Sequence, residues 1–154
     1  MKTSVAQIER VSSCKESLIF PEGIIGFAEH KEYAVINEKS KEPFVLMQSE
    51  KDSGLNFVVV DPREIMPDYN PSLSEADKLA LGVESVEECQ CFSIVTIPQD
   101  SDKISVNLLA PILINQRRGI GRQVVLQDQN YSLQHQILDE MTKQSEDKDV
   151  SSLT

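Results

Sequence analysis

The chain has 154 residues, 40% of them hydrophobic, and a formal net charge of −10 at pH 7 from 15 Lys and Arg against 25 Asp and Glu. A chain of this length buries roughly 68–70% of its unfolded surface and builds a single core without disulfides or a metal. Its apolar runs, such as Phe57–Val60, are far shorter than the ~20 residues that cross a bilayer. This excludes a transmembrane helix, and we expect no membrane partner.

Targeting and redox signals favour the cytoplasm. Residues 1–10 have no apolar stretch behind the early Lys2, so they do not read as a secretory signal. The cysteines are odd in number, at Cys14, Cys89 and Cys91. Without a signal peptide, an odd count predicts reduced thiols rather than a disulfide framework.

Charge is distributed unevenly along the chain. Residues 1–104 hold 10 basic and 19 acidic side chains, residues 105–136 hold three arginines and one aspartate, and residues 137–154 hold 2 basic and 5 acidic side chains. Nucleic-acid affinity comes largely from Lys and Arg that neutralise phosphates, so we expect no direct binding of RNA or DNA. An acidic surface instead attracts basic proteins through long-range fields.

The first half of the chain shows the pattern of short strands separated by turns. The segments are bounded by Pro, Gly, Asn and Asp, and the apolar runs among them are too short for helices. The predicted strands cover residues 4–11, 17–20, 33–36, 44–47 and 55–60.

One helix is well signalled between residues 74 and 82. Ser74 can cap its first turn together with Asp77, three residues on, and Gly82 can adopt the left-handed conformation that ends a helix. Leu79 and Leu81 are expected to supply its apolar contacts. A weaker helical turn is predicted at residues 85–88.

Strands resume after this helix. Cys91–Ile97 is rich in β-branched residues and ends at Pro98. Ser105–Ala110 continues past Pro111 into Ile112–Asn115, which predicts one long strand broken by a bulge or at an edge position. Gly119–Gly121 then predicts a hairpin turn into a strand over residues 123–126.

About eight strands and one or two short helices predict a mainly β fold, a small antiparallel β-barrel that is closed or nearly closed. We place this single domain at residues 1–138. Residues 139–154 are polar and acidic and lack aromatics, which predicts a C-terminal tail that is mobile or docks on a partner. Ile137, Leu138 and Met141 share one side of a short helix there, and could form the docking side.

Nothing in the sequence argues for an enzyme. Neither histidine, His30 or His135, lies in a recognisable catalytic motif, and no motif pairs carboxylates for acid and base chemistry. Cys89 and Cys91 are separated by a single residue and lack a second ligand pair, so we expect no metal site. We expect no cofactor either, because the G-x-G at residues 119–121 leads into a strand rather than a helix.

Three arginines, Arg117, Arg118 and Arg122, surround that glycine turn. One interpretation is a hairpin turn with solvated arginines. The other is a local basic patch that binds a carboxylate or an acidic partner segment.

Seven segments, read together and in order, resemble the flagellar assembly factor FliW family. The resemblance runs from about Leu18 to Ile137. The segments are Phe20–Phe27, Phe44–Ser49, Leu55–Pro62, Pro67–Tyr69, Ile94–Pro98, Asn107–Asn115 and Gly121–Leu126.

The resemblance implies a non-enzymatic bacterial cytoplasmic protein with two partners in turn. One is flagellin, bound through its C-terminal helical region before export. The other is CsrA, a small RNA-binding translational repressor, which the protein antagonises once export of flagellin has released it. Synthesis of flagellin then follows its secretion.

The candidate partner-binding residues are an apolar loop at Ile24 and Ile25, the three arginines, and the tail side chains, which we favour for the repressor. Glycines and apolar residues around Ile24 also fit a turn packed on the core. Two other functions stay open: a small-molecule-binding β-barrel or small enzyme, which needs a deep enclosed pocket, and a structural subunit of the flagellar export machinery.

Overall fold

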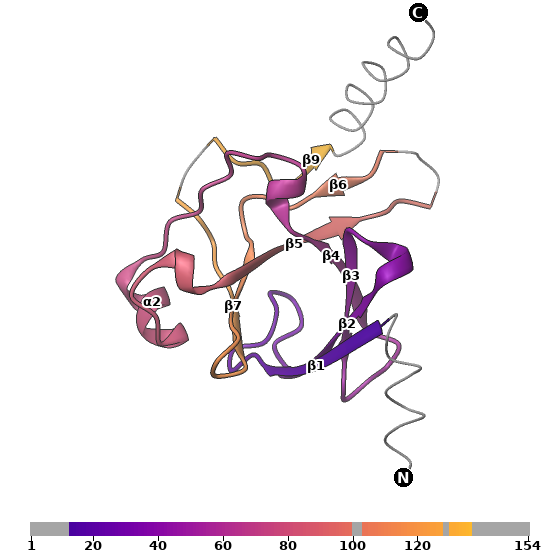
Figure 1. The fold of residues 1–154 in the computed structure, drawn as a ribbon, viewed down its shortest axis with the longest axis horizontal. Helices are drawn as coiled ribbons and strands as arrows, with labels where there is room; N and C mark the ends of the chain where they lie inside the picture. Colours follow the sequence, from indigo (N-terminus) through magenta and orange to yellow (C-terminus); the bar gives the residue numbers. More distant parts are fainter. Residues whose placement is uncertain (1–12, 100–102, 128–129, 137–154) are drawn as a thin grey trace, which may run out of the picture.

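The computed structural model describes residues 13–99, 103–127 and 130–136, in which nine strands form one sheet. The strands are β1 (Ser13–Ile19), β2 (Glu32–Glu38), β3 (Phe44–Ser49), β4 (Asn56–Val60), β5 (Gln90–Thr96), β6 (Ser105–Val106), β7 (Ile112–Asn115), β8 (Ile120–Gln123) and β9 (His135–Gln136). Their order in the sheet is β4-β3-β2-β1-β8-β7-β5-β6-β9. A further pairing of β4 with β5 closes seven of them into a barrel, seen as a ring in Figure 1. The predicted mainly β barrel is confirmed.

The first four strands form an antiparallel meander. In β3, buried residues alternate with half-buried ones, as expected for a strand with one face on the core. Tyr33 and Val35 of β2 pair with Ser49 and Met47 of β3, and Met47 in turn pairs with Phe57 of β4. The predicted strands at residues 33–36, 44–47 and 55–60 are therefore confirmed. The segment 4–11 lies outside the described residues.

Two strand pairings, between β4 and β5 and between β1 and β8, close the barrel, and they differ in the number of residue pairs. Between β4 and β5, three residue pairs join, at Val58↔Val95, Val59↔Ile94 and Val60↔Ser93. Between β1 and β8 a single pair, Ile19↔Ile120, joins two parallel strands, and the Ile19 N–H donates to the carbonyl of Gly119 at 2.8 Å. The barrel is thus antiparallel except at this pairing of β1 with β8.

Residues 105–115 form two strands rather than one long strand. Both pair with β5, but β6 pairs with Val95 and Thr96, whereas β7 pairs with Gln90–Phe92. The side chain of Asn107 accepts hydrogen bonds from the N–H groups of Leu109 and Ala110, so the chain turns locally between them. The interruption is larger than the bulge expected from Pro111.

The hairpin after β7 is confirmed, but its second strand begins at Ile120, three residues earlier than predicted. Gly119 has a φ of 66°, a conformation that glycine adopts without strain. Gly121 serves a different purpose: a Cβ there would lie 2.8 Å from Cε1 of the buried Phe20 ring and closer still to Cζ. It permits β8 to approach the barrel core.

The helix α2 (Glu75–Leu81) begins and ends as predicted. Ser74 and Asp77 form a reciprocal capping box, and Gly82 ends the helix with a φ of 73°. Leu81 is fully buried, but Leu79 is 84% exposed, so the expectation that both leucines contact the core is wrong for Leu79. A helix of seven residues lying along the barrel buries only one stripe of side chains.

Three short 3-10 helices, η2 (Lys39–Lys41), η3 (Pro62–Glu64) and η4 (Val86–Glu88), complete the described elements. The last coincides with the helical turn predicted at residues 85–88. None of the helices in the described part of the chain has the length and apolarity needed to span a bilayer.

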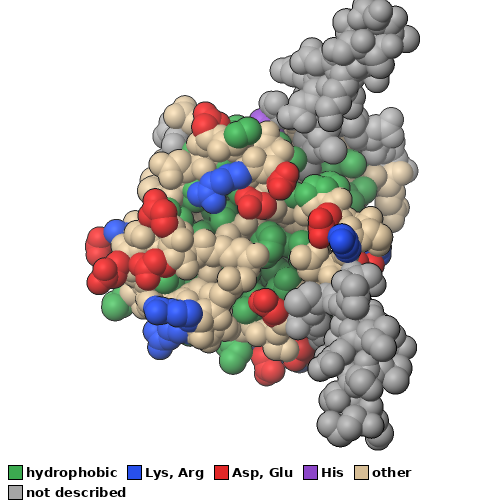
Figure 2. Space-filling view, in the orientation of Figure 1, with side chains coloured by type: hydrophobic (Ala, Val, Ile, Leu, Met, Phe, Trp, Pro, Cys, Tyr) green, Lys and Arg blue, Asp and Glu red, His purple; other side chains and the backbone are tan. Residues whose placement is uncertain are grey.

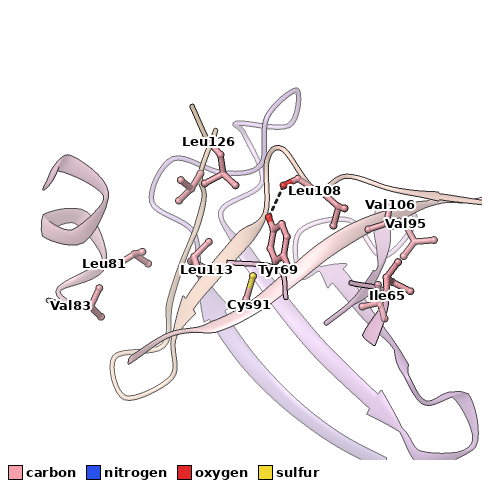
Figure 3. Close-up of a cluster of buried hydrophobic side chains, with 12 residues drawn as sticks. Ile65, Tyr69, Leu81, Val83, Cys91, Val95, Val106, Leu108, Leu113 and Leu126 are labelled. Atoms are coloured by element: carbon pink, nitrogen blue, oxygen red, sulfur yellow. Dashed lines mark hydrogen bonds between the residues drawn. The ribbon is translucent and has the colours of Figure 1, made fainter. Parts of the chain in front are cut away.

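Two clusters of apolar side chains form the core. One fills the barrel, with Phe20, Tyr33, Met47 and Ile112 fully buried in it. The other lies between the barrel wall and α2 with its flanking loops, and Figure 3 shows Tyr69 at its centre. Side chains fill the interior of the barrel, which argues against the alternative of a barrel built around a small-molecule pocket.

Candidate partner-binding surfaces

The loop that follows β1 places the two candidate isoleucines differently. Ile24 is 1% exposed and packs in the barrel cluster, so its side chain belongs to the core. Ile25 is 61% exposed, and its N–H donates to Oε1 of Gln123 at 2.8 Å. Gly23 makes the tight loop possible, because a Cβ there would lie 2.7 Å from Cα of Ala28. Of the predicted pair, only Ile25 has an exposed side chain.

Phe27 adds a second apolar group to this loop. Its ring is 41% exposed and meets the Phe57 ring edge to face, with centroids 5.5 Å apart. The Phe27 N–H donates to the Ile24 carbonyl at 2.7 Å, which closes a tight turn within the loop. The sequence alone does not single out Phe27, because only the fold shows that its ring is exposed.

Arg122 joins the barrel to both α2 and the loop after β1. Its Nε donates to Oδ1 of Asp77 at 2.9 Å, and its Nη1 bonds to Glu22. Burial alone would raise the pKa of the Asp77 carboxyl, but hydrogen bonds from Arg122 and Ser74 outweigh it and hold that pKa below its ordinary value. The hydrogen bond to Asp77 correspondingly raises the pKa of Arg122. The positive charge of Arg122 is therefore balanced by carboxylates of the same chain.

The other two arginines lie on the turn between β7 and β8, and both are exposed. The guanidinium of Arg118 lies against Gly82, where a Cβ would overlap it. Arg117 is near enough to Glu88 to lower the pKa of that carboxyl slightly, although the N–H groups of Glu84 and Ser85 are the main cause. The three arginines thus do not form one free basic patch, since Arg122 is engaged with carboxylates.

The cysteine pair is packed against the core beside α2. Burial raises the pKa of the Cys91 thiol to about 12 and also raises that of Cys89. Both are free thiols. In the described part of the chain, no three His, Cys, Asp or Glu side chains are grouped to hold a metal ion. His30 is partly buried, with Nδ1 2.8 Å from Oγ of Ser49.

The C-terminal candidates Ile137, Leu138 and Met141 lie outside the described residues, as does the predicted boundary between residues 138 and 139. The chain is described as far as β9, which pairs with β6 through Val106↔His135. The tail therefore stays a prediction.

An open hollow of about 450 Å³ lies between α2 and the end of β8. One wall is formed by Leu73, Ala76 and Asp77, and the other by Gln123 and Val125 among their neighbours. Sequence reasoning did not single out these residues, because the two walls are about fifty residues apart in the chain. Val125 is 54% exposed, which only the fold shows.

Comparison with known proteins finds relatives of this chain in both sequence and structure. The sequence profile of the family described as FliW protein matches residues 3–137. The flagellar assembly factor FliW of Leptospira biflexa is 39% identical over 87% of this chain and 88% of its own length, and that of Bacillus subtilis is 32% identical over 80% and 86%. A crystal structure of the flagellar assembly factor FliW superposes with a TM-score of 0.71 at 30% identity, over 79% of this chain and 84% of that one. The barrel, its capped helix and the seven recognised segments therefore belong to a member of the FliW family of flagellar assembly factors.

Proposed function

We propose that this chain binds flagellin through the C-terminal helical region of flagellin before export and, once released, binds and antagonises a CsrA-type translational repressor. Synthesis of flagellin then follows its secretion. The observation that carries the proposal is the match to flagellar assembly factors over more than four fifths of both chains. We place this activity in the cytoplasm, as binding rather than catalysis, without a cofactor.

Exposed apolar side chains on a rigid loop support the flagellin half of the proposal. A helix is recognised by laying its apolar side on an apolar surface. Ile25 and Phe27 supply such a surface, and the bond from Ile25 to Gln123 of β8 and the Phe27–Ile24 bond within the loop hold it in place. Ile24 supports the loop from inside.

Surface charge supports the repressor half. Figure 2 shows carboxylates spread over the face in view, with Lys and Arg at only a few places. The net charge of −10 attracts a basic RNA-binding protein and raises the cost of bringing RNA phosphates beside it. We propose that RNA release arises from this electrostatic antagonism, with a coupling of about 1–3 kcal/mol. The tail side chains Ile137, Leu138 and Met141 are the proposed repressor contact.

The flagellin contact is tested by Ile25→Asp, with Leu79→Asp as the matched control. Both leave the core intact and place a charge on an exposed apolar position, but only Ile25 lies on the proposed surface. We expect Ile25→Asp to weaken binding of purified flagellin at least about tenfold in calorimetry, the scale of a central interface contact. Equal affinities of the two variants for flagellin would place its site elsewhere, and no binding by the wild-type chain would overturn the assignment.

The repressor contact is tested by removing residues 137–154, which contain all three proposed contact residues, and, separately, by salt. We expect the truncated chain to keep flagellin and lose the repressor. In a gel shift with the repressor saturated by this protein, RNA release should weaken as salt rises, because the Debye length is only about 10 Å at 0.1 M. Release that is unchanged between low and high salt contradicts the electrostatic account. A stable assembly that never exchanges partners would instead support a structural export subunit.

A further inference from the structure

The chain from β8 to Leu126 makes backbone hydrogen bonds along one of its edges, to the segment that leads into β7. The N–H groups of Val124 and Leu126 donate to the carbonyls of Pro111 and Leu109, each at 2.9 Å. Successive residues of a strand direct their backbone N–H and C=O groups to opposite sides. Those of Gln123 and Val125 therefore point away from this neighbour.

The opposite edge carries no strand in the described part of the molecule. The only strand on that side of β8 is β1, and it pairs with Ile120 alone, before the chain reaches Gln123. Backbone groups at a free edge are a template for another strand. Gln123 and Val125 thus present two N–H donors and two carbonyl acceptors in a row.

The hollow between α2 and β8 runs along this edge. Gln123 and Val125 line it from one face of the strand, and Arg122 and Leu126 line it from the other. Residues of both faces can border the same hollow only where it follows the edge between them. The opposite wall contributes the apolar side chains of Leu73 and Ala76.

Charges around the hollow favour a basic occupant. Arg122 is shared by two carboxylates, Asp77 and Glu22, which leaves one negative charge in excess. Glu75, whose side chain is 94% exposed, lies 3.5 Å from the ammonium of Lys78, which balances its charge, so the local excess stays at one negative charge. The acidic excess of the whole chain acts in the same direction.

We propose that this edge binds an extended basic segment of a partner protein, which pairs with Gln123 and Val125 as an added strand. Alternate side chains of the segment lie over Leu73 and Leu126, and its Lys or Arg side chains approach Glu22 and Glu75. Main-chain bonds supply affinity and the side-chain positions supply selectivity, as in other strand-addition interfaces. The inference is independent of the flagellin and repressor proposals, since it rests on the free edge, the hollow beside it and the charges around that hollow.

The test uses the full chain labelled with ¹⁵N and a capped peptide of sequence Lys-Val-Thr-Val-Thr-Val-Lys. We expect the amide signals of Gln123 and Val125 to shift and their hydrogen exchange to slow at least about tenfold, while Val124, already bonded to Pro111, keeps its rate. Peptide N-methylated at alternate residues loses donors and should bind about threefold to tenfold more weakly per lost bond.

Two results overturn the proposal. One is no shift at Gln123 and Val125 with millimolar peptide, and the other is equal binding of the N-methylated peptide. Protection of both amides in a peptide-free dimer would assign the edge to a second copy of this chain, and would also overturn it.

Charge is tested by Glu75→Lys, at a position between the lining residues Ser74 and Ala76, with Glu87→Lys, an exposed position in η4, as the matched control. We expect only Glu75→Lys to weaken peptide binding. Equal effects of the two variants refute the basic preference.

Discussion

Replacing Arg122 by methionine tests how firmly α2 and the loop after β1 are fixed to the barrel. The Arg122–Asp77 pair is largely shielded, with side-chain exposures of 23% and 14%, whereas Glu22 is 70% exposed. A hydrogen bond to a charged group in such a place stabilises by about 1.5–3 kcal/mol, and an exposed ion pair by about 0–1 kcal/mol. We expect Arg122→Met to lower the free energy of unfolding by about 2–3 kcal/mol, mainly through Asp77.

Urea denaturation followed by circular dichroism measures this change at neutral pH. Arg117→Met is the control, because that exposed side chain makes no such bond, and its effect should stay within about 0.5 kcal/mol. A double-mutant cycle of Arg122→Met with Asp77→Asn should return a coupling on the order of 0.5–3 kcal/mol. Equal midpoints for Arg117→Met and Arg122→Met would refute the reasoning.

Acid gives an independent check of the same pair. A carboxyl whose pKa is lowered on folding stabilises the fold above its unfolded pKa, and this contribution is lost as pH falls through the folded pKa. For Asp77, whose ordinary value is 3.8, the difference between wild type and Arg122→Met should be constant from about pH 7 to about pH 5 and shrink below about pH 4. A difference that persists undiminished in acid would show that the loss is one of packing.

Three further predictions concern the core. Gly121→Ala should destabilise the fold by about 1–3 kcal/mol in thermal unfolding, because the new Cβ overlaps the Phe20 ring. Adding Phe20→Leu should restore part of the lost stability. A Gly121→Ala variant as stable as the wild type would contradict the close approach of β8 to Phe20. Tyr69→Phe should cost about 1–3 kcal/mol in urea, since the Tyr69 hydroxyl donates to the buried Leu108 carbonyl at 2.6 Å, and an unchanged midpoint would argue against that bond. Cys91 should resist alkylation at about pH 8 in the folded chain and react in urea, as its buried thiol has a pKa of about 12; rapid labelling when folded would refute its burial.

Local signals in the sequence predicted the elements that are stabilised locally. The capping pair Ser74 and Asp77 and the terminal Gly82 act within one helix, and the strands β2 to β4 follow from short apolar runs between turns. These features need only neighbouring residues, so a single sequence is enough to find them.

Contacts between distant residues were the part that could not be predicted. Arg122 meets Glu22 and Asp77 across separations of 100 and 45 residues, so its apparent freedom in the sequence was misleading. The orientation of Leu79 depends on how a short helix lies on the barrel. Gly121 resembles a turn residue, yet its role is set by a ring 101 positions earlier in the chain.

The single parallel pair between Ile19 and Ile120 also sets the order in which the barrel can be built. The hairpins of β1 to β4 join neighbours and can form as soon as these strands leave the ribosome. Closure between β1 and β8 must wait until the chain has been made past Ile120, and it carries the loop entropy of about a hundred residues. Until then the edge of β1 that later pairs with β8 is exposed in the nascent chain, where it can pair with other chains. We therefore expect the nascent chain to be prone to aggregation until the last third of the sequence has been made and β8 covers this edge.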